Sequence, residues 1–221
     1  MPRVLSAHRC PGCEIRRPLC FCAMIPHIEL QTRVIILMHT GEEVLPSNTA
    51  RLAAKALPNS EIRVNGRIGD RLSMDGLVEE GRQSLLLFPS SHAAELTPAY
   101  VAGLKGPFNL IVPDGKWRQC QKFSRREPAL VGIPHVKVPI GKPSEYKLRT
   151  QPNDNSLCTL EAIARALGAL ESRDAQDQLE AVLRVMVERT LWARGMLTEI
   201  QCTVAGIPPE AFSMRAPDRV V

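Results

Sequence analysis

A short apolar run that ends in Pro113-Asp114-Gly115 constrains the fold of this chain more than any other stretch. The run, Phe108–Val112, has the composition of a β-strand buried on both faces, which is typical of parallel sheets covered by helices. Beyond it, apolar residues from Trp117 onward recur three apart, and basic residues recur at helical spacing on another face. These basic residues are Arg118, Lys122, Arg125 and Arg126. The strand therefore delivers a carboxylate and an indole to its carboxyl end, where open α/β sheets bind ligands. A plain strand–turn–helix with a solvated basic face explains the same spacing.

Further apolar runs alternate with amphipathic stretches along the chain. Strands are expected at 33–38, 61–65, 84–88, 108–112 and 135–140, and helices at 48–57, from Trp117 onward, at 157–170 and at about 176–197. This alternation is that of βα units and predicts an α/β domain over 31–200, with a mostly parallel sheet of about five strands. The basic loop 141–155 is long enough to suggest a functional role, and the Pro-rich tail, 201–221, is expected to be irregular.

Four of the seven cysteines lie within thirteen residues of the N-terminal segment. They form a CxxC–x6–CxC pattern and are Cys10, Cys13, Cys20 and Cys22. Two close thiolate pairs on short turns can enclose Zn²⁺ in a tetrahedral four-sulfur shell, which leaves no open position for catalysis. We therefore expect a structural zinc knuckle over 1–30, with a redox pair and unmetallated core cysteines as the alternatives.

The charge distribution suggests a polyanionic partner. The formal net charge of the 221 residues is only +5, but the segment Lys116–Arg149 holds nine Lys and Arg residues against only two acidic residues, Glu127 and Glu145. A local positive field of this kind favours nucleic acid, and a solvated surface is the alternative. The sequence contains no apolar run long enough for a membrane span and no signal-like N-terminal segment, so we expect a cytoplasmic enzyme without membrane contact.

Common catalytic motifs are missing. We find no Walker lysine loop, no GxGxxG after a strand, no GxSxG elbow and no HExxH pair. These absences argue against the commoner NTPase, dehydrogenase, hydrolase and zinc-protease classes.

Three features together resemble the DTW-domain family: Asp114-x-x-Trp117, the four-cysteine cluster, and Leu-Cys-Thr-Leu-Glu at 157–161. The resemblance spans about residues 10–170. Members of this family are tRNA-uridine aminocarboxypropyltransferases related to the knotted SPOUT methyltransferases. One position departs from the family pattern, because Lys116 replaces the Thr that usually precedes the Trp.

The resemblance implies a SPOUT-like fold with a C-terminal knot-type cofactor site. It also implies a reaction, the transfer of the 3-amino-3-carboxypropyl group of S-adenosylmethionine to N3 of a tRNA uridine, with methylthioadenosine as co-product. A SPOUT-type RNA methyltransferase and a non-catalytic zinc-knuckle RNA-binding protein are the alternatives. The implied cofactor site comprises Leu87, Phe88, Pro89, Ser90, Pro113, Asp114, Gly115, Trp117, Val138, Ile140, Cys158, Thr159 and Glu161. Asn48, Thr49 and Arg51 are weaker site candidates. RNA contacts are expected from Lys116, Arg118, Lys122, Arg125 and Arg126. The sequence leaves open which uridine is modified and whether the chain dimerises.

Asp114 is the expected catalytic residue. Uridine N3 carries a proton at neutral pH, and an unperturbed Asp, with a pKa of about 3.9, is a weak base for it. Burial beside Trp117 could raise the pKa of Asp114, or the ionised carboxylate could accept a hydrogen bond from N3–H and take the proton as the new bond forms. Because a nearby Lys116 would lower the pKa, the sequence favours the second route.

Overall fold

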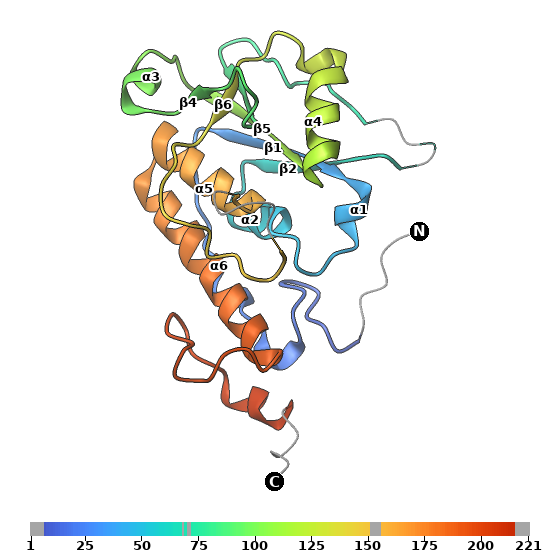
Figure 1. The fold of residues 1–221 in the computed structure, drawn as a ribbon, viewed down its shortest axis with the longest axis vertical. Helices are drawn as coiled ribbons and strands as arrows, with labels where there is room; N and C mark the ends of the chain where they lie inside the picture. The colour runs from blue at the N-terminus through green and yellow to red at the C-terminus, as the bar shows by residue number, and fades with distance from the viewer. Residues whose placement is uncertain (1–6, 68, 70–71, 151–155, 215–221) are drawn as a thin grey trace.

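The computed structural model describes residues 7–67, 69, 72–150 and 156–214, and it contains one six-stranded sheet in which every strand pair is parallel. The strand order is β2-β1-β5-β3-β6-β4 (Figure 1). The strands are β1 (Arg33–His39), β2 (Ser60–Asn65), β3 (Gln83–Leu87), β4 (Ala94–Glu95), β5 (Phe108–Asp114) and β6 (His135–Lys137).

The strand β5 lies between β1 and β3 and is buried over most of its length. Its side chains alternate between two hydrophobic clusters, since Leu110 and Val112 belong to one and Ile111 belongs to the other. The pairing with β1 continues to its last residue, where Asp114 lies beside Met38. The apolar run thus forms the centre of the sheet and carries Asp114 to its carboxyl edge.

Helices cover both faces of the sheet (Figure 1). The helices are α1 (Thr40–Glu43), α2 (Ala50–Ala56), α3 (Pro98–Ala102), α4 (Trp117–Arg126), α5 (Thr159–Leu170) and α6 (Arg173–Ala193), and short 3-10 turns are η1 (Arg17–Leu19), η2 (Cys22–Met24), η3 (Pro128–Leu130) and η4 (Pro209–Met214). The larger cluster joins α2, α5 and α6 to one face, and the smaller cluster includes Cys120 of α4 on the other.

The expected parallel α/β sheet is confirmed, with two differences in detail. The two-residue strand β4 was not expected, because its sequence is too short to show a pattern. The strand β6 ends at Lys137 instead of residue 140, and Pro139, which has no N–H to donate, lies in the missing part. The SPOUT-like knot and the three-part division of the chain stay predictions.

The N-terminal knuckle shares its core with the rest of the chain. Leu19 and Phe21 are buried in the same cluster as α5 and α6. The buried Arg189 of α6 donates hydrogen bonds to the carbonyl oxygens of Leu19 (3.1 Å) and Cys20 (2.7 Å). The knuckle is therefore packed on α6 and bonded to it.

Part of the tail that was expected to be irregular is helical. Pro209–Met214 form η4, and the ring of Phe212 meets buried Trp192 edge-on, with centroids 5.4 Å apart. The last seven residues of the predicted tail, and residues 151–155 of the predicted loop, lie outside the described residues. No described helix combines the length and apolar character needed to cross a membrane.

Candidate active site and metal centre

A cleft of about 470 Å³ opens at the carboxyl end of β5. Three segments far apart in sequence form it: the turn before α2, the strand end with the start of α4, and the loop that leads into α5. Its lining comprises Glu42, Leu45, Ser47, Asn48, Thr49, Asp114, Gly115, Lys116, Trp117, Tyr146, Arg149, Thr150, Ser156, Leu157, Cys158 and Thr159. The cleft thus brings the Asp114-x-x-Trp117 motif beside the start of the helix at Cys158-Thr159, two stretches that the family resemblance assigned to one cofactor site.

Asp114 is held by one donor from each of the other two segments. The Thr159 hydroxyl donates to Oδ1 (2.5 Å), and the Asn48 side-chain amide donates to Oδ2 (2.8 Å). The carboxyl group is almost completely buried. Since each carboxylate oxygen can accept more than one hydrogen bond, Asp114 retains the capacity to accept another.

Burial is the main influence on Asp114, and it raises the pKa of this carboxyl group. The nearby charge of Glu42 acts in the same direction, whereas the hydrogen bonds from Thr159 and Asn48 oppose the rise in pKa. The cation that lowers the pKa is Arg149, and Lys116 is exposed at the start of α4. Burial thus raises the pKa of Asp114 despite the nearby cation, whereas the sequence analysis expected Lys116 to lower it; the catalytic role of Asp114 stays a prediction.

Two charged residues of the cleft, Glu42 and Arg149, were missed by the sequence analysis. An Nη1 of Arg149 lies 2.8 Å from the Glu42 carboxylate, and its Nε donates to the Ser47 hydroxyl (3.0 Å). Its Nη2 is buried and has no hydrogen-bond partner among the described residues. Arg149 lies in a loop without periodicity, so only the long basic loop itself could have indicated it.

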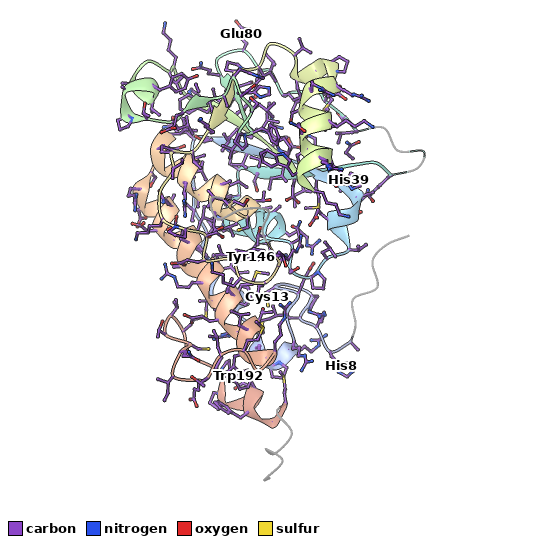
Figure 2. All side chains as sticks on the ribbon, viewed as in Figure 1. His8, Cys13, His39, Glu80, Tyr146 and Trp192 are labelled. Carbon is purple, nitrogen blue, oxygen red and sulfur yellow. The ribbon has the colours of Figure 1, made fainter. Side chains whose placement is uncertain are left out.

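Glu161 lies beneath the cleft and anchors the loop instead of lining the opening. Glu161 is 2% exposed, and its carboxylate accepts hydrogen bonds from the Ser144 hydroxyl (2.7 Å), Glu145 N (2.7 Å) and Cys158 N (2.9 Å). One carboxylate thereby joins the described start of loop 141–155 to the start of α5. Tyr146, labelled in Figure 2, lies on this loop and donates to the carbonyl oxygen of Ser47 (2.8 Å).

Trp117 stands at the mouth of the cleft with 49% of its surface exposed. Its ring contacts Phe88, with centroids 5.0 Å apart, so the end of β3 touches the site through this pair. The other residues expected at the cofactor site from the ends of β3 and β6 do not line the cleft. They are Leu87, Pro89, Ser90, Val138 and Ile140, and Pro113 is likewise outside the lining.

The basic face of α4 is exposed beside the cleft. Arg118, Lys122, Arg125 and Arg126 are all exposed, and Lys116, the residue before the helix, lines the opening. Lys116 has the extended backbone of an N-cap, and its N–H donates to the Gln119 side chain (3.0 Å). Its side chain lacks the oxygen that a Thr would offer to the first turn of the helix.

The weaker site candidates, Asn48, Thr49 and Arg51, lie in two different places relative to the cleft. Asn48 contacts Asp114, and Thr49 lines the cleft. Arg51 instead lies behind the cleft, where it pairs with Glu14 of the knuckle (2.6 Å) and donates to the Glu43 carbonyl oxygen (2.7 Å). Arg51 therefore fixes the turn that carries Asn48 to the knuckle.

The four cysteines of the knuckle form a compact cluster. All four sulfur atoms lie within 4.8 Å of one another, and three of the contacts measure 3.4, 3.5 and 3.7 Å. A tetrahedral shell with about 2.3 Å per zinc–sulfur bond has edges of about 3.8 Å. A Cβ on Gly12 would collide with the Cys22 sulfur, so the CxxC turn needs glycine at this position. The cluster can hold a metal ion.

Sequence comparison agrees with the arrangement of these residues. The profile of the DTW domain family matches residues 7–191, which include the knuckle, the cleft and most of α6. The chain belongs to the DTW domain family.

Named relatives of this DTW domain protein share about three residues in ten with it. It is 31% identical over 172 residues to "tRNA-uridine aminocarboxypropyltransferase 2" of Drosophila melanogaster, covering 75% of this chain and 68% of that protein. It is 29% identical to the Mus musculus protein of the same name, of which it spans 57%. It is 27% identical to "tRNA-uridine aminocarboxypropyltransferase A" of Arabidopsis thaliana, over 80% of this chain and 79% of that protein. No solved structure matches the DTW domain protein.

Proposed function

We propose that this protein transfers the 3-amino-3-carboxypropyl group of S-adenosylmethionine to N3 of a uridine in tRNA. The observation that carries the proposal is Asp114, buried at the carboxyl end of β5 in a cleft with Trp117 at its mouth. Family membership and the names of the relatives support the reaction class. A tRNA substrate also agrees with the basic surface beside the cleft and with the cytoplasmic location expected from the sequence.

The residues of the cleft fit an S-adenosylmethionine donor, whose sulfonium activates the carbon that is transferred. The exposed indole of Trp117 offers a flat apolar surface for an adenine or a uracil ring. Arg149 pairs with Glu42 through Nη1, and its Nη2, which has no hydrogen-bond partner among the described residues, is the proposed donor to a carboxylate. We propose that Asp114, Gly115, Trp117, Cys158 and Thr159 bind the donor. Pro113 and the ends of β3 and β6 lie at its margin, and Glu161 holds the loop in place.

Asp114 is the proposed base. It accepts the proton of uridine N3 as the N3–carbon bond forms and the carbon–sulfur bond of the donor breaks, so that methylthioadenosine leaves with the bonding electron pair. A raised pKa makes the carboxylate a better proton acceptor than an ordinary Asp. Thr159 and Asn48 orient the carboxylate, each through one of its two oxygens. Because N3 lies on the Watson–Crick edge, the uridine must be unpaired before it reaches Asp114.

We propose structural Zn²⁺ for the four-cysteine cluster. Four thiolates form a closed shell with a formal charge of −2, so this metal takes no part in the transfer. The buried guanidinium of Arg189, bonded to the backbone of the knuckle, supplies nearby positive charge.

The test is incubation of the purified protein with S-adenosylmethionine and unmodified tRNA, followed by mass spectrometry of the nucleosides and identification of the co-product. Aminocarboxypropyl-uridine together with methylthioadenosine is the expected result. S-adenosylhomocysteine with a methylated nucleoside would overturn the proposal in favour of a methyltransferase. Binding of tRNA and S-adenosylmethionine without any transferred group would overturn it in favour of an RNA-binding protein.

A further inference from the structure

A second cavity, of about 270 Å³, lies between the knuckle, the loop before residue 150 and the C-terminal half of α6. The knuckle contributes one wall, Leu148 another, and α6 the third, from Met186 to Arg194. In Figure 2, Tyr146 marks the loop, Cys13 marks the knuckle and Trp192 marks α6, and the three labels follow one another down the molecule in this order. The function proposed above assigns no role to this cavity.

The charged residues that line this cavity are all positive. Arg9, Arg16 and Arg194 line it, and its described lining includes no Asp or Glu. Arg9 and Arg194 donate to the carbonyl oxygens of Glu14 (2.9 Å) and Leu148 (3.2 Å). Within the part of the chain that the structure describes, neither guanidinium is paired with a carboxylate. Arg16 and Arg194 are exposed. Three guanidinium groups around one cavity repel one another and attract an anion with several acceptor oxygens.

The interior of the cavity is suited to more than a simple anion. Its buried walls are apolar, from Ile15, Leu19 and Leu148. On α6, the hydroxyl oxygen of Thr190 is buried and has no hydrogen-bond partner among the described residues. Apolar walls, an unused hydroxyl and a cationic rim together suit a ligand with a flat ring, a sugar and a phosphate.

The two cavities are neighbours. Ser47 lines both, and its two oxygen atoms accept hydrogen bonds from Tyr146 and Arg149 on the side of the active-site cleft. A polymeric ligand with one unit beside Asp114 would pass Ser47, and its next unit would lie between the knuckle and α6. Consecutive nucleotides of a single strand are connected in this way.

We infer that the second cavity binds a nucleotide of the tRNA that flanks the target uridine, with its phosphate held by Arg9, Arg16 and Arg194. The inference rests on the proposed function for its ligand, tRNA. It gives the knuckle a direct part in RNA binding and makes the substrate an unpaired segment of at least two nucleotides.

The test compares Arg16→Ala, Arg16→Glu and Arg194→Ala with Arg173→Ala, which removes the same charge from an exposed position at the far end of α6. Unmodified tRNA, a uridine-containing trinucleotide and S-adenosylmethionine are the probes, each titrated over a salt series. Each cavity variant should weaken tRNA and trinucleotide binding about tenfold, and Arg16→Glu should weaken them further. Each alanine variant should flatten the slope of log K against log salt by about 0.7. Binding of S-adenosylmethionine, and the melting temperature, should stay as in the wild type.

Loss of tRNA affinity no greater than that of Arg173→Ala would overturn the inference. It would also fail if inorganic phosphate at the same concentration displaced the trinucleotide completely, since the cavity would then be a general anion site. Because binding is the readout, this test is separate from that of the proposed reaction. A protein without transfer activity that still needs Arg16 and Arg194 to bind tRNA would refute the proposed function and retain this inference.

Discussion

The orientation and pKa of Asp114 depend on residues that are distant from it in sequence. Its strand places it at the edge of the sheet, but Asn48 and Thr159 determine its orientation, and burial raises its pKa. The same carboxyl group in an exposed turn would titrate near pH 4 and would bind weakly to a uridine N–H. The fold therefore supplies what the motif alone lacks.

Replacement of Asp114 by Asn should separate chemistry from binding. The variant keeps the size of the side chain but removes the proton acceptor, so we expect the single-turnover transfer rate to fall by roughly 10²–10⁴. Affinities for tRNA and S-adenosylmethionine should stay near those of the wild type. The matched control is Asp177→Asn on the exposed part of α6, which should leave the rate unchanged. An Asp114→Asn rate within a few-fold of wild type would make Asp114 a structural residue.

Substitutions of Thr159 and Glu42, two neighbours of Asp114, should move the acid limb of the pH–rate profile in opposite directions. The ionised carboxylate is the active form, so the rate falls as pH drops through its raised pKa. Thr159→Val removes a donor that favours the ionised form, which should move the limb to higher pH. Glu42→Gln removes a repelling charge, which should move it to lower pH. Thr159→Ser, which keeps the hydroxyl, is the control, and limbs that stay in place would mean that another group titrates.

At the scale of elements, α4 has a basic face and an unusual first residue. Helices favour Ser, Thr, Asp or Asn at the N-cap because a side-chain oxygen accepts from the free N–H groups of the first turn. Lys116 offers no such oxygen, while Gln119 still accepts from the Lys116 N–H. The Thr of the family pattern would supply the missing side-chain oxygen, which could accept a hydrogen bond from an N–H group of the first turn.

Lys116→Thr should therefore stabilise the protein. We expect the free energy of unfolding to rise by about 1 kcal/mol, the usual contribution of an N-cap oxygen. Equilibrium denaturation in urea measures the change. Lys122→Thr, in the exposed interior of the same helix, should lower the free energy of unfolding slightly because Thr is a poorer helix former. Equal effects of both substitutions would show that the gain comes from the lost charge and not from capping.

The exposed face of α4 should contact phosphates outside the cleft. Alanine at Arg118, Lys122, Arg125 or Arg126 should weaken tRNA binding and flatten the log K against log salt slope by roughly 0.7–0.9 at each position. The effect should be the same for tRNAs of different sequence. Unchanged affinity and slope in all four variants would leave this face as solvated surface.

At the scale of the molecule, the knuckle and α6 form one packed unit. Arg189 contacts the knuckle backbone, and Arg51 of α2 pairs with Glu14 between two of the cysteines. A metal ion in the cluster would thus fix both the wall of the second cavity and the turn that carries Asn48. This arrangement links metal content to stability.

Purified protein should contain one equivalent of zinc, measured by elemental analysis. Cys20→Ser should lower the metal content and the melting temperature. It should weaken tRNA binding more than S-adenosylmethionine binding, because the proposed cofactor site lies outside the knuckle. Cys202→Ser, a buried cysteine outside the cluster, is the control for loss of a thiol. Full stability in the presence of a strong chelator, with no metal detected, would contradict a structural zinc.

Much of this architecture follows from patterns in the sequence, and the exceptions have physical reasons. The apolar run ending at Asp114 and the cysteine spacing are local signals, so the central strand and the compact sulfur cluster were predictable. Glu42 and Arg149 meet only in the folded chain, at a separation of 107 residues. Glu42 lies in a four-residue helix that is too short to show a period, and Arg149 lies in a loop. Glu161 matched a ligand-binding pattern, yet its three donors come from the loop and the start of its own helix. Local spacing does not distinguish a carboxylate that binds a ligand from one that anchors a loop.

The environment of Asp114 also determines when the site can exist during synthesis. Its two partners lie 66 residues before it and 45 residues after it. A ribosome that has released Asp114 has still to release Thr159 and the helix that buries the carboxyl group. An emerging chain therefore carries an ordinary, water-exposed aspartate until α5 docks on the sheet, and the hydrogen-bonded environment of Asp114 is completed only when most of the protein has been translated.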